Sequence, residues 1–458
     1  MTGSVSMQEW GLASQTLASR AVATPEIYPA EDLTERMRLR VCWNCGHPRN
    51  FGLPSHLFAI QGARQNQSVK RKTYIWEKIF MPSPVYLDCN ATTPLDDAVR
   101  EVLLRYLTED FGNEGSRTHE YGSRAKQAVQ RARDQVAAVV AAARDEVIFT
   151  SGATESNNLA ILGLAEEGER SGRRHVVTTR LEHKAVLEPI EYLADRGFAV
   201  TYLDIDASGR VDPEAVASVL RQDTLLVSVM QANNETGIRQ PILELAEVLG
   251  GHDAYFHCDA AQGFGKDLEE LRHPRIDLIS VSGHKIFGPK GIGALVARRR
   301  GYRRIPLKAL TVGGGQERGL RPGTLPVPLI AALGEAAESA LRSYEQRKAR
   351  CLAIRETALD ALAPLGIKLT GDQNHVMPHV MNFSVAGIDS EALIVGLKDL
   401  IAISNGSACT STSYSASHVL LSMGMSEDEA NACVRISWCH LTPDVEWAAV
   451  TERIRRLL

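Results

Sequence analysis

The sequence predicts an α/β protein with a mostly parallel sheet, helices on both of its faces, and a smaller α+β domain. Two observations predict this fold. From residue 95 to about 300, short apolar segments alternate with helix-like segments, which is typical of parallel strands joined by helical crossovers. Beyond about residue 345 this alternation ends, and fewer strands and helices follow in a less regular order.

The elements of the larger part follow in order along the chain. Strands are expected where short apolar runs are bounded by turn residues, at 147–150, 175–179, 200–203, 225–230, 254–258 and 278–281. Helices are expected between them where apolar residues recur with the helical period, at 155–166, 185–194, 213–220 and 243–249. Ligands bind at the carboxyl ends of parallel strands, so the residues that follow each strand are the candidates for a site.

The smaller part begins after a helical stretch at 328–349. Its strands are expected at 379–384, 401–404 and 434–438, and its helices near 391–400 and from 444 onward. We therefore expect a large ligand-binding domain at 81–345, whose first residues pack on the small domain, and a small C-terminal domain at 346–458.

Residues 1–80 differ from the rest because they show no sustained period, and a break at 81–84 (Met-Pro-Ser-Pro) follows them. We expect an N-terminal extension that is flexible or not native. Cys42 and Cys45 are close in sequence to His47, which suggests a zinc site. A structural zinc site usually has four ligands, and no second pair is nearby, so no metal is expected.

The composition excludes several classes of protein. The 458 residues are 44% hydrophobic and 23% charged, which is typical of a globular chain. The net charge of −4 does not favour direct nucleic-acid binding. Apolar runs such as 136–143 and 392–397 are too short to span a membrane, and no secretory signal is visible. The eight cysteines then suggest reduced thiols and a cytoplasmic protein.

Lys285 and Asp259 each follow a strand. Lys285 ends the sequence Ser-Gly-His-Lys at 282–285, and a desolvated lysine can form a Schiff base with an aldehyde. Asp259 follows the strand at 254–258, where a carboxylate can keep a pyridine nitrogen protonated. One strand separates the two residues, so both can point at one ligand. Taken singly, a surface lysine and a helix-capping aspartate fit these positions as well or better.

A third feature is the sequence Thr-Ser-Gly-Ala-Thr-Glu at 150–155, between a predicted strand and a predicted helix. The free N–H groups and the positive end of a helix dipole favour a phosphate at such a turn. It is not the nucleotide-binding loop with a lysine, and a plain capped turn is the alternative interpretation.

Cys409 stands in a stretch of small polar residues at 404–411. A thiol in that setting can be exposed and reactive, because the thiolate is the nucleophile. The other cysteines of the main part are interpreted as packing residues, since free cysteine is often buried; they are Cys89, Cys258, Cys351, Cys433 and Cys439.

Arg435 lies within an apolar strand-like run at 433–438. A guanidinium there needs a partner, and a carboxylate suits its geometry. A substrate carboxylate and a structural salt bridge fit the position equally well.

Together these features resemble the cysteine desulfurases of the NifS/IscS class, within the fold-type I pyridoxal-phosphate transferases. The resemblance runs from about residue 85 to the C-terminus. It rests on motifs at 86–88, 91–94, 149–156, 182–186, 233–237, 282–289, 313–319, 323–324 and 406–411, the last resembling the long cysteine loop of the first subgroup.

The resemblance implies a role for each candidate around pyridoxal 5'-phosphate. Lys285 binds the cofactor covalently and Asp259 pairs with its pyridine nitrogen. Gln262 and Asn234 contact its phenolic oxygen, and His183 stacks on the ring and moves protons. The phosphate is held by Ala153, Thr154, Ser282 and His284, with Thr324 from a second subunit of a homodimer. For the substrate, Arg435 and Asn382 bind the carboxylate and Cys409 receives the sulfur.

The implied activity is removal of sulfur from L-cysteine, which yields L-alanine and an enzyme persulfide on Cys409 for an acceptor protein. Three pathways use such enzymes: iron–sulfur cluster assembly, tRNA thiolation and DNA phosphorothioation. The alternatives are selenocysteine cleavage or another fold-type I reaction, such as aminotransfer, and a non-catalytic binding protein.

Some positions depart from the family pattern. Cys89 occupies a variable place, the segment 112–116 lacks a proline, and Trp-Cys-His at 438–440 replaces a hydrophobic residue and glycine. Members that bind the iron–sulfur scaffold carry a further C-terminal tail, whereas this chain stops at Leu458. We therefore expect a specialised acceptor, with DNA phosphorothioation as one candidate.

Overall fold

The computed structural model describes residues 83–406 and 416–458. The expectations for the first 80 residues, for Cys42 and Cys45, and for the position of Cys409 lie outside the described residues. Within those two ranges, no helix is long and apolar enough to cross a membrane.

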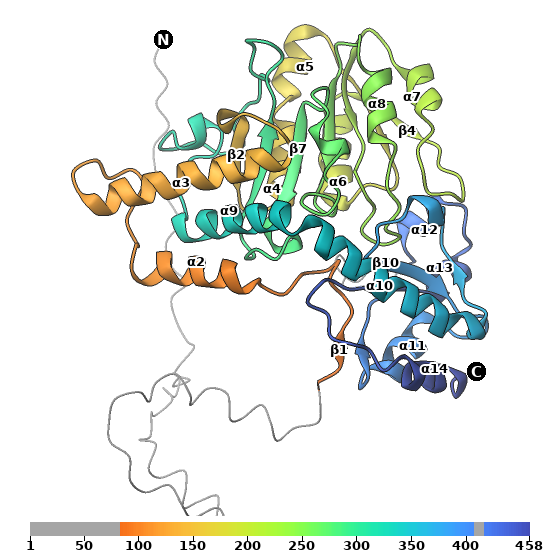
Figure 1. Ribbon diagram of the computed structural model, residues 1–458. Coiled ribbons are helices and arrows are strands. Elements are labelled where there is room, and N and C mark those ends of the chain that lie inside the picture. The colour runs from red at the N-terminus through yellow and green to blue at the C-terminus, as the bar shows by residue number, and fades with distance from the viewer. Residues whose placement is uncertain (1–82, 407–415) are drawn as a thin grey trace, which may run out of the picture. The chain divides into compact units, whose positions relative to one another are not determined.

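A seven-stranded sheet forms the centre of the fold (Figure 1). Its strands, in spatial order, are β2 (Val147–Thr150), β8 (Gly293–Ala297), β7 (Leu278–Ser282), β6 (Tyr255–Asp259), β5 (Thr224–Ser228), β3 (His175–Thr179) and β4 (Ala199–Leu203). The pairs from β7 to β4 are parallel, which confirms the predicted mostly parallel sheet. Strand β8 was missed: it pairs antiparallel with β2 and β7, and Gly291 and Gly293 give its sequence the character of a turn.

Helices cover both faces of this sheet, as predicted. Alternate residues of each strand point to opposite faces, so Phe149 and Ile148 enter different hydrophobic clusters. One face packs against α2 (Asp97–Thr108), α3 (Glu120–Val139), α7 (Pro213–Val219), α8 (Ile242–Val248) and α9 (Val327–Arg342). The other packs against α4 (Ala153–Leu162), α5 (Ala165–Ser171) and α6 (Lys184–Asp195).

A separate hydrophobic cluster forms among the C-terminal elements. It contains the antiparallel sheet of β12 (Cys433–Ser437), β10 (Val380–Ser384) and β9 (Lys368–Leu369), with α10 (Tyr344–Leu362), α11 (Ser390–Leu397) and α14 (Trp447–Arg455). The short strand β1 (Val85–Tyr86) pairs with β11 (Ile401–Ala402), which brings the start of the described chain to this cluster. The single helical stretch expected at 328–349 is wrong, because the chain breaks at Ser343 between α9 and α10.

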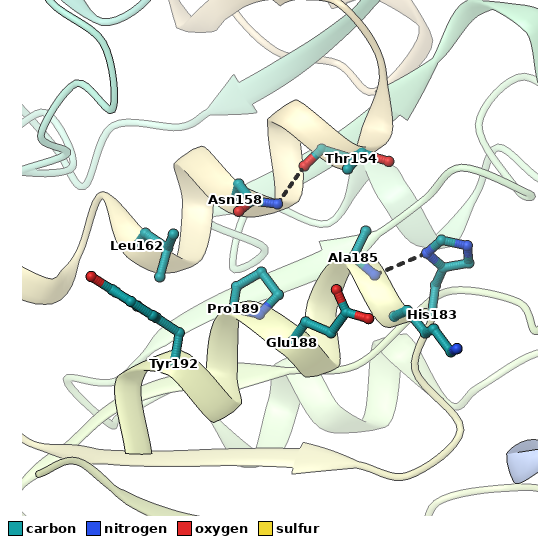
Figure 2. A pocket seen from close by; sticks show the side chains of 9 residues that line it. Thr154, Asn158, Leu162, His183, Ala185, Glu188, Pro189 and Tyr192 are labelled. Atoms are coloured by element: carbon teal, nitrogen blue, oxygen red, sulfur yellow. Dashed lines mark hydrogen bonds between the residues drawn. The ribbon is translucent and has the colours of Figure 1, made fainter. Parts of the chain in front are cut away.

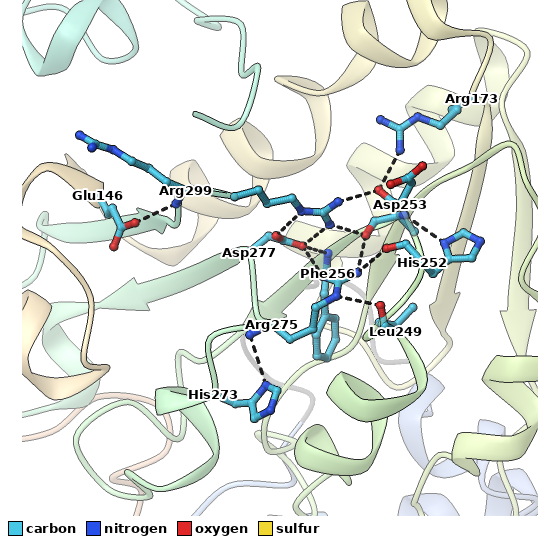
Figure 3. Close-up of polar contacts among 12 residues, drawn as sticks. Glu146, Arg173, Leu249, His252, Asp253, Phe256, His273, Arg275, Asp277 and Arg299 are labelled. Atoms are coloured by element: carbon cyan, nitrogen blue, oxygen red, sulfur yellow. Dashed lines mark hydrogen bonds and ion pairs between the residues drawn. The ribbon is translucent and has the colours of Figure 1, made fainter. Parts of the chain in front are cut away.

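The amino ends of β6 and β7 are held by the carboxylate of Asp277 (Figure 3). Its Oδ2 accepts a 2.7 Å hydrogen bond from the Phe256 amide and a 2.6 Å bond from Arg275. Arg300 donates to both carboxylate oxygens at 2.7 Å. The Asp277 side chain is only 4% exposed. This buried network therefore fixes the amino ends of β6 and β7, at the end of the sheet away from the carboxyl ends of the strands.

We expect Asp277→Ala to lower the free energy of unfolding by about 3–5 kcal/mol, because it leaves two largely shielded guanidinium groups without their carboxylate. The control is Asp399→Ala, since Asp399 and Arg453 form an ion pair exposed to solvent, and such pairs contribute little to stability. Urea unfolding midpoints of the two variants check this. Equal midpoints for both variants would show that the buried network contributes no more than a surface pair.

Candidate active site

A cavity of about 510 Å³ opens at the carboxyl ends of β5, β6 and β7. This volume is in the range of sites for small organic ligands. Ten of the predicted site residues line it: Ala153, Thr154, His183, Asn234, Asp259, Gln262, Ser282, His284, Lys285 and Arg435. The structure therefore gathers at one place residues that are far apart in the sequence.

Lys285 and Asp259 come from neighbouring strands. Asp259 is the last residue of β6, and Lys285 ends a single 3-10 turn, Gly283–Lys285, directly after β7. The register pairs Asp259 with Ser280, so the two strands end side by side. The Lys285 ammonium donates to the backbone carbonyls of Asn90 and Ala91, the latter at 2.8 Å. Two bonds to the main chain fix the amine at the cavity wall.

The Asp259 carboxylate is 5% exposed and holds two hydrogen bonds. Asn157 donates its side-chain N–H to Oδ2 at 2.7 Å, and the Ala261 amide donates to Oδ1 at 2.9 Å. Both donors fix the orientation of the carboxylate. Asp259 therefore presents an oriented acceptor group to the cavity.

The turn between β2 and α4 also lines the cavity. Helix α4 begins at Ala153, so the first backbone N–H groups of that helix lie beside Ser282 and His284. Strand β8 approaches this turn closely: a Cβ on Gly293 would lie 2.6 Å from the Gly152 Cα. Glycine at 293 is thus required for the approach. Burial and the nearby Lys285 ammonium lower the pKa of His284 to about 4, so this histidine is neutral near neutral pH.

His183 also lines the cavity, directly before the first residue of α6 (Figure 2). Its Nδ1 accepts a 3.0 Å hydrogen bond from the Ala185 amide, which leaves the proton of the neutral ring on Nε2. Burial lowers the pKa of this imidazole. Beyond His183, Figure 2 shows a second hollow between α4 and α6 that shares Thr154, His183 and Ala185 with the cavity.

A buried polar atom without a hydrogen-bond partner in the described residues shows whether the cavity wall suits pyridoxal phosphate. Gln262 donates to the Asn90 carbonyl at 3.0 Å, whereas its buried Oε1 has no hydrogen-bond partner among the described residues. Buried polar atoms rarely stay unpaired. A phenolic hydroxyl can donate to that oxygen, the Asp259 carboxylate suits a pyridinium, and the α4 N-terminus suits a phosphate. The residues present fit the cofactor.

The contacts of Arg435 are compatible with both interpretations that the sequence left open, a structural salt bridge and a binding group for a substrate carboxylate. Its side chain, 1% exposed, forms a 2.5 Å ion pair with Asp88 and donates to the Asn234 carbonyl at 2.9 Å. It also lines the cavity, and its Nε has no hydrogen-bond partner within the described ranges. The salt bridge with Asp88 thus orients the Arg435 guanidinium, while its Nε–H remains a possible hydrogen-bond donor.

Three predicted residues are not among those that line the cavity. Asn382 lies opposite Arg435 in the small sheet, and its side chain bonds to Thr370 at 2.6 Å and to the Glu235 carbonyl at 3.4 Å. Thr324 is exposed on this chain, and its expected role lies in the site of a second subunit. Cys409 lies outside the described residues.

Sequence reasoning missed Asn157 and Asn90, which hold the predicted residues in place. Asn157 follows the turn motif by one helical turn, a spacing that points its side chain back toward the sheet. Asn90 supplies the carbonyl that accepts from both Lys285 and Gln262. The position of Asn157 near the start of a predicted helix could have been used to predict its contact. The contacts of Asn90 join residues that are too far apart in the sequence to be inferred from spacing.

The fold and this site define a pyridoxal-phosphate enzyme of fold type I. Residues 85–446 match the aminotransferase class-V family. Among relatives, the chain is 44% identical to the cysteine desulfurase IscS of Anaeromyxobacter sp. (strain Fw109-5), over 82% of this chain and 94% of that protein. It is also 44% identical to the Homo sapiens cysteine desulfurase, over 79% of both chains.

Solved structures agree with this assignment. The crystal structure of DndA from Streptomyces lividans is 50% identical, with a TM-score of 0.69 over 79% of this chain and 99% of that one. SspA, solved in complex with cysteine, is 35% identical, with a TM-score of 0.68 over 78% of this chain and all of SspA. The chain belongs to the aminotransferase class-V family and, within it, to the cysteine desulfurases of the NifS/IscS class. Its cofactor is pyridoxal 5'-phosphate.

Proposed function

We propose that this chain removes the sulfur of L-cysteine, releases L-alanine and carries the sulfur as a persulfide on Cys409. The observation that carries the proposal is the convergence of the Lys285 amine, the Asp259 carboxylate and the Arg435 guanidinium on one cavity. The relatives named cysteine desulfurase support the substrate.

The bound cofactor would supply an electron-withdrawing ring that makes the bonds next to the substrate's α-carbon easier to break. Lys285 would hold the cofactor through its Nζ and, once released, would move a proton at that atom. Asp259 would keep a proton on the ring nitrogen, and Asn157 orients that carboxylate by donating to Oδ2.

The remaining residues bind and orient. The neutral His183 would stack on the ring and donate or accept a proton at Nε2. The α4 N-terminus, Ser282 and His284 would hold the phosphate. Arg435 would bind the substrate carboxylate while Asp88 fixes its planar group.

The Cys409 thiolate would attack the substrate sulfur. A sulfur–sulfur bond forms and the carbon–sulfur bond breaks, and its electron pair stays on the substrate carbon. That carbon takes up a proton, and the product leaves as alanine. The sulfur then stays on the enzyme until an acceptor thiol attacks it.

An assay with L-cysteine and a thiol reductant tests the proposal. We expect equal amounts of alanine and sulfide. Formation of pyruvate and ammonia, or of neither alanine nor sulfide by cofactor-loaded protein, would contradict the proposal.

We expect Asp259→Ala to lower kcat by about 10²-fold or more, because the ring nitrogen loses the carboxylate that keeps it protonated. Asn157→Ala is the matched control. It removes one hydrogen bond worth about 0.5–1.5 kcal/mol, so its kcat should fall far less. Steady-state alanine formation with saturating cofactor measures both variants, and equal losses would assign the effect to disturbed packing.

We also propose a homodimer in which Thr324 of the second subunit completes the phosphate site, and an acceptor protein that takes the sulfur. The acceptor would serve iron–sulfur assembly, tRNA thiolation or DNA phosphorothioation. Cells fed radiolabelled cysteine sulfur distinguish these pathways, because deletion of the gene should remove label from only one of the three products. If the deletion leaves the amount of label unchanged in all three products, all three pathways are excluded.

The division at residue 345 is likewise a proposal. It is supported by the separate hydrophobic cluster of the C-terminal elements and by the break at Ser343.

A further inference from the structure

Another cavity lies apart from the active site, and the two share no lining residue within the described part of the chain. Its wall includes Lys266, Arg347, Cys351, His379 and Cys439. The chemistry proposed above uses none of these side chains. Arg347 is paired with Asp96 at 2.7 Å, whereas Lys266 lies on the cavity wall together with two thiols.

Cys439 lies next to a second thiol, that of Cys89. The two residues are 4% and 1% exposed and form a small cluster with Phe287. The main chain brings them together: the Cys89 amide donates to the Ser437 carbonyl at 3.0 Å at the end of β12. Their side chains lie in this one cluster, close enough for each thiol to affect the pKa of the other. Both cysteines belong to the positions that depart from the family pattern.

The surroundings distinguish the two thiols. Contact with Cys89, together with the Leu441 amide, the Thr442 hydroxyl and the charge of Lys266, lowers the pKa of Cys439. The same contact and burial raise the pKa of Cys89. Cys439 is therefore the thiol of the pair that ionises more readily, and it lines the cavity.

Lys266 is placed to assist this thiol. It lies on the cavity wall with Cys439, and its Nζ is 3.4 Å from the His379 Nε2. Burial lowers the pKa of Lys266 to about 8, so its ammonium can give up a proton. The third cysteine of the cavity, Cys351, has its pKa raised to about 12 by burial and is not a nucleophile.

We propose that Cys89 and Cys439 form a redox-active thiol pair, a second reactive site that takes small hydroperoxides. The Cys439 thiolate attacks a peroxide oxygen, the O–O bond breaks, and the leaving oxygen takes a proton from Lys266. Cys439 becomes a sulfenic acid. The Cys89 sulfur then attacks the Cys439 sulfur, and an S–S bond forms as water leaves. The two thiols lose two electrons, which reduce one hydrogen peroxide to two waters.

The pair is connected to the active site through the neighbours of Cys89. Asp88 forms the ion pair with Arg435, and the Asn90 carbonyl accepts from Lys285. A disulfide draws two sulfurs to about 2.05 Å, closer than any hydrogen-bonded pair of thiols. We expect this closure to move Cys89 and, with it, the neighbouring groups of Asp88 and Asn90 that orient Arg435 and Lys285. Oxidation should therefore stop desulfuration, a consequence that rests on the proposed function.

Peptide mapping tests the pair without any reading of activity. The full-length, cofactor-loaded Cys409→Ser protein, which lacks the competing thiol, is treated with hydrogen peroxide, alkylated and digested. We expect the peptides that contain Cys89 and Cys439 to be joined by a disulfide that dithiothreitol breaks. In a Cys89→Ala variant the reaction should stop at a sulfenic acid on Cys439, which dimedone traps. Cys89→Ser serves if that variant folds poorly, and Cys351→Ala is the control that should still form the disulfide.

A pair that stays fully alkylated after this treatment would overturn the proposal, as would a disulfide that joins Cys439 to Cys351. The link to activity has its own test, a single turnover of cysteine after peroxide is removed and before any reductant is added. Peroxide also oxidises Cys409 in both proteins, so the chain with Cys89 intact should lose more alanine formation than Cys89→Ala after the same treatment. If the disulfide forms and activity persists, the thiol pair stands and only its coupling to the active site fails.

Discussion

Lys285→Ala is expected to abolish cysteine turnover, by about 10⁴-fold or more, and to remove the yellow colour that survives dialysis in the intact enzyme. The amine has two functions, the covalent attachment of the cofactor and the movement of a proton, and the loss of the proton transfer alone is worth about 10²–10⁴-fold. Its hydrogen bonds to the carbonyls of Asn90 and Ala91 hold it at the cavity wall, so both functions depend on this one positioned amine.

Two controls separate the functions of Lys285. Lys285→Arg keeps a positive charge beside the same carbonyls, yet a guanidinium cannot form the covalent link, so this variant should be as inactive as the alanine variant. Added methylamine should restore part of the turnover of Lys285→Ala by replacing the missing base. Absorbance spectra after dialysis and alanine formation measure both effects. Normal turnover in either variant would remove Lys285 from the mechanism.

Cys409→Ser is expected to lower sulfide release from cysteine by about 10³-fold, because a hydroxyl remains protonated near neutral pH whereas a thiolate is a strong nucleophile. The cofactor colour should be kept, since Cys409 is not expected to hold the cofactor. Cys433→Ala is the matched control: Cys433 is buried in the strand that carries Arg435, and its loss should leave turnover close to that of the intact chain.

Selenocysteine provides a second substrate for the same variant. Its carbon–selenium bond can break without help from an enzyme thiol. Cys409→Ala that still cleaves selenocysteine but not cysteine would favour the selenocysteine lyase alternative. Undiminished release of sulfide from cysteine by Cys409→Ser would exclude the thiol from sulfur transfer altogether.

The sequence predicted the parallel strands well because each is an apolar run that ends in a polar or small residue at one edge of the sheet. Asp259 and Lys285 were found by that rule. Strand β8 was missed because it pairs antiparallel inside the sheet and starts with Gly293, where a side chain would collide with Gly152. Only the three-dimensional approach of β8 to the turn explains that glycine.

The limits of the sequence are clearest where a residue acts through the main chain. Asn90 positions Lys285 and Gln262 with its carbonyl oxygen, and any residue type has such an oxygen. The interpretation of five cysteines as packing residues was confirmed for their burial. It did not anticipate that Cys89 and Cys439 lie together in one buried cluster, because that contact joins opposite ends of the described chain.

One measurement tests the central claim most directly, namely that the amine of Lys285 holds the cofactor beside Asp259. The cofactor-loaded protein is reduced with borohydride, which makes the link to the cofactor permanent, and its peptides are mapped by mass spectrometry. We predict that the cofactor is attached to Lys285. Two other lysines make the test strict, because Lys290 lines the same cavity and the pKa of Lys266 is lowered to about 8. Cofactor found on either of them, with Lys285 unmodified, would contradict the account.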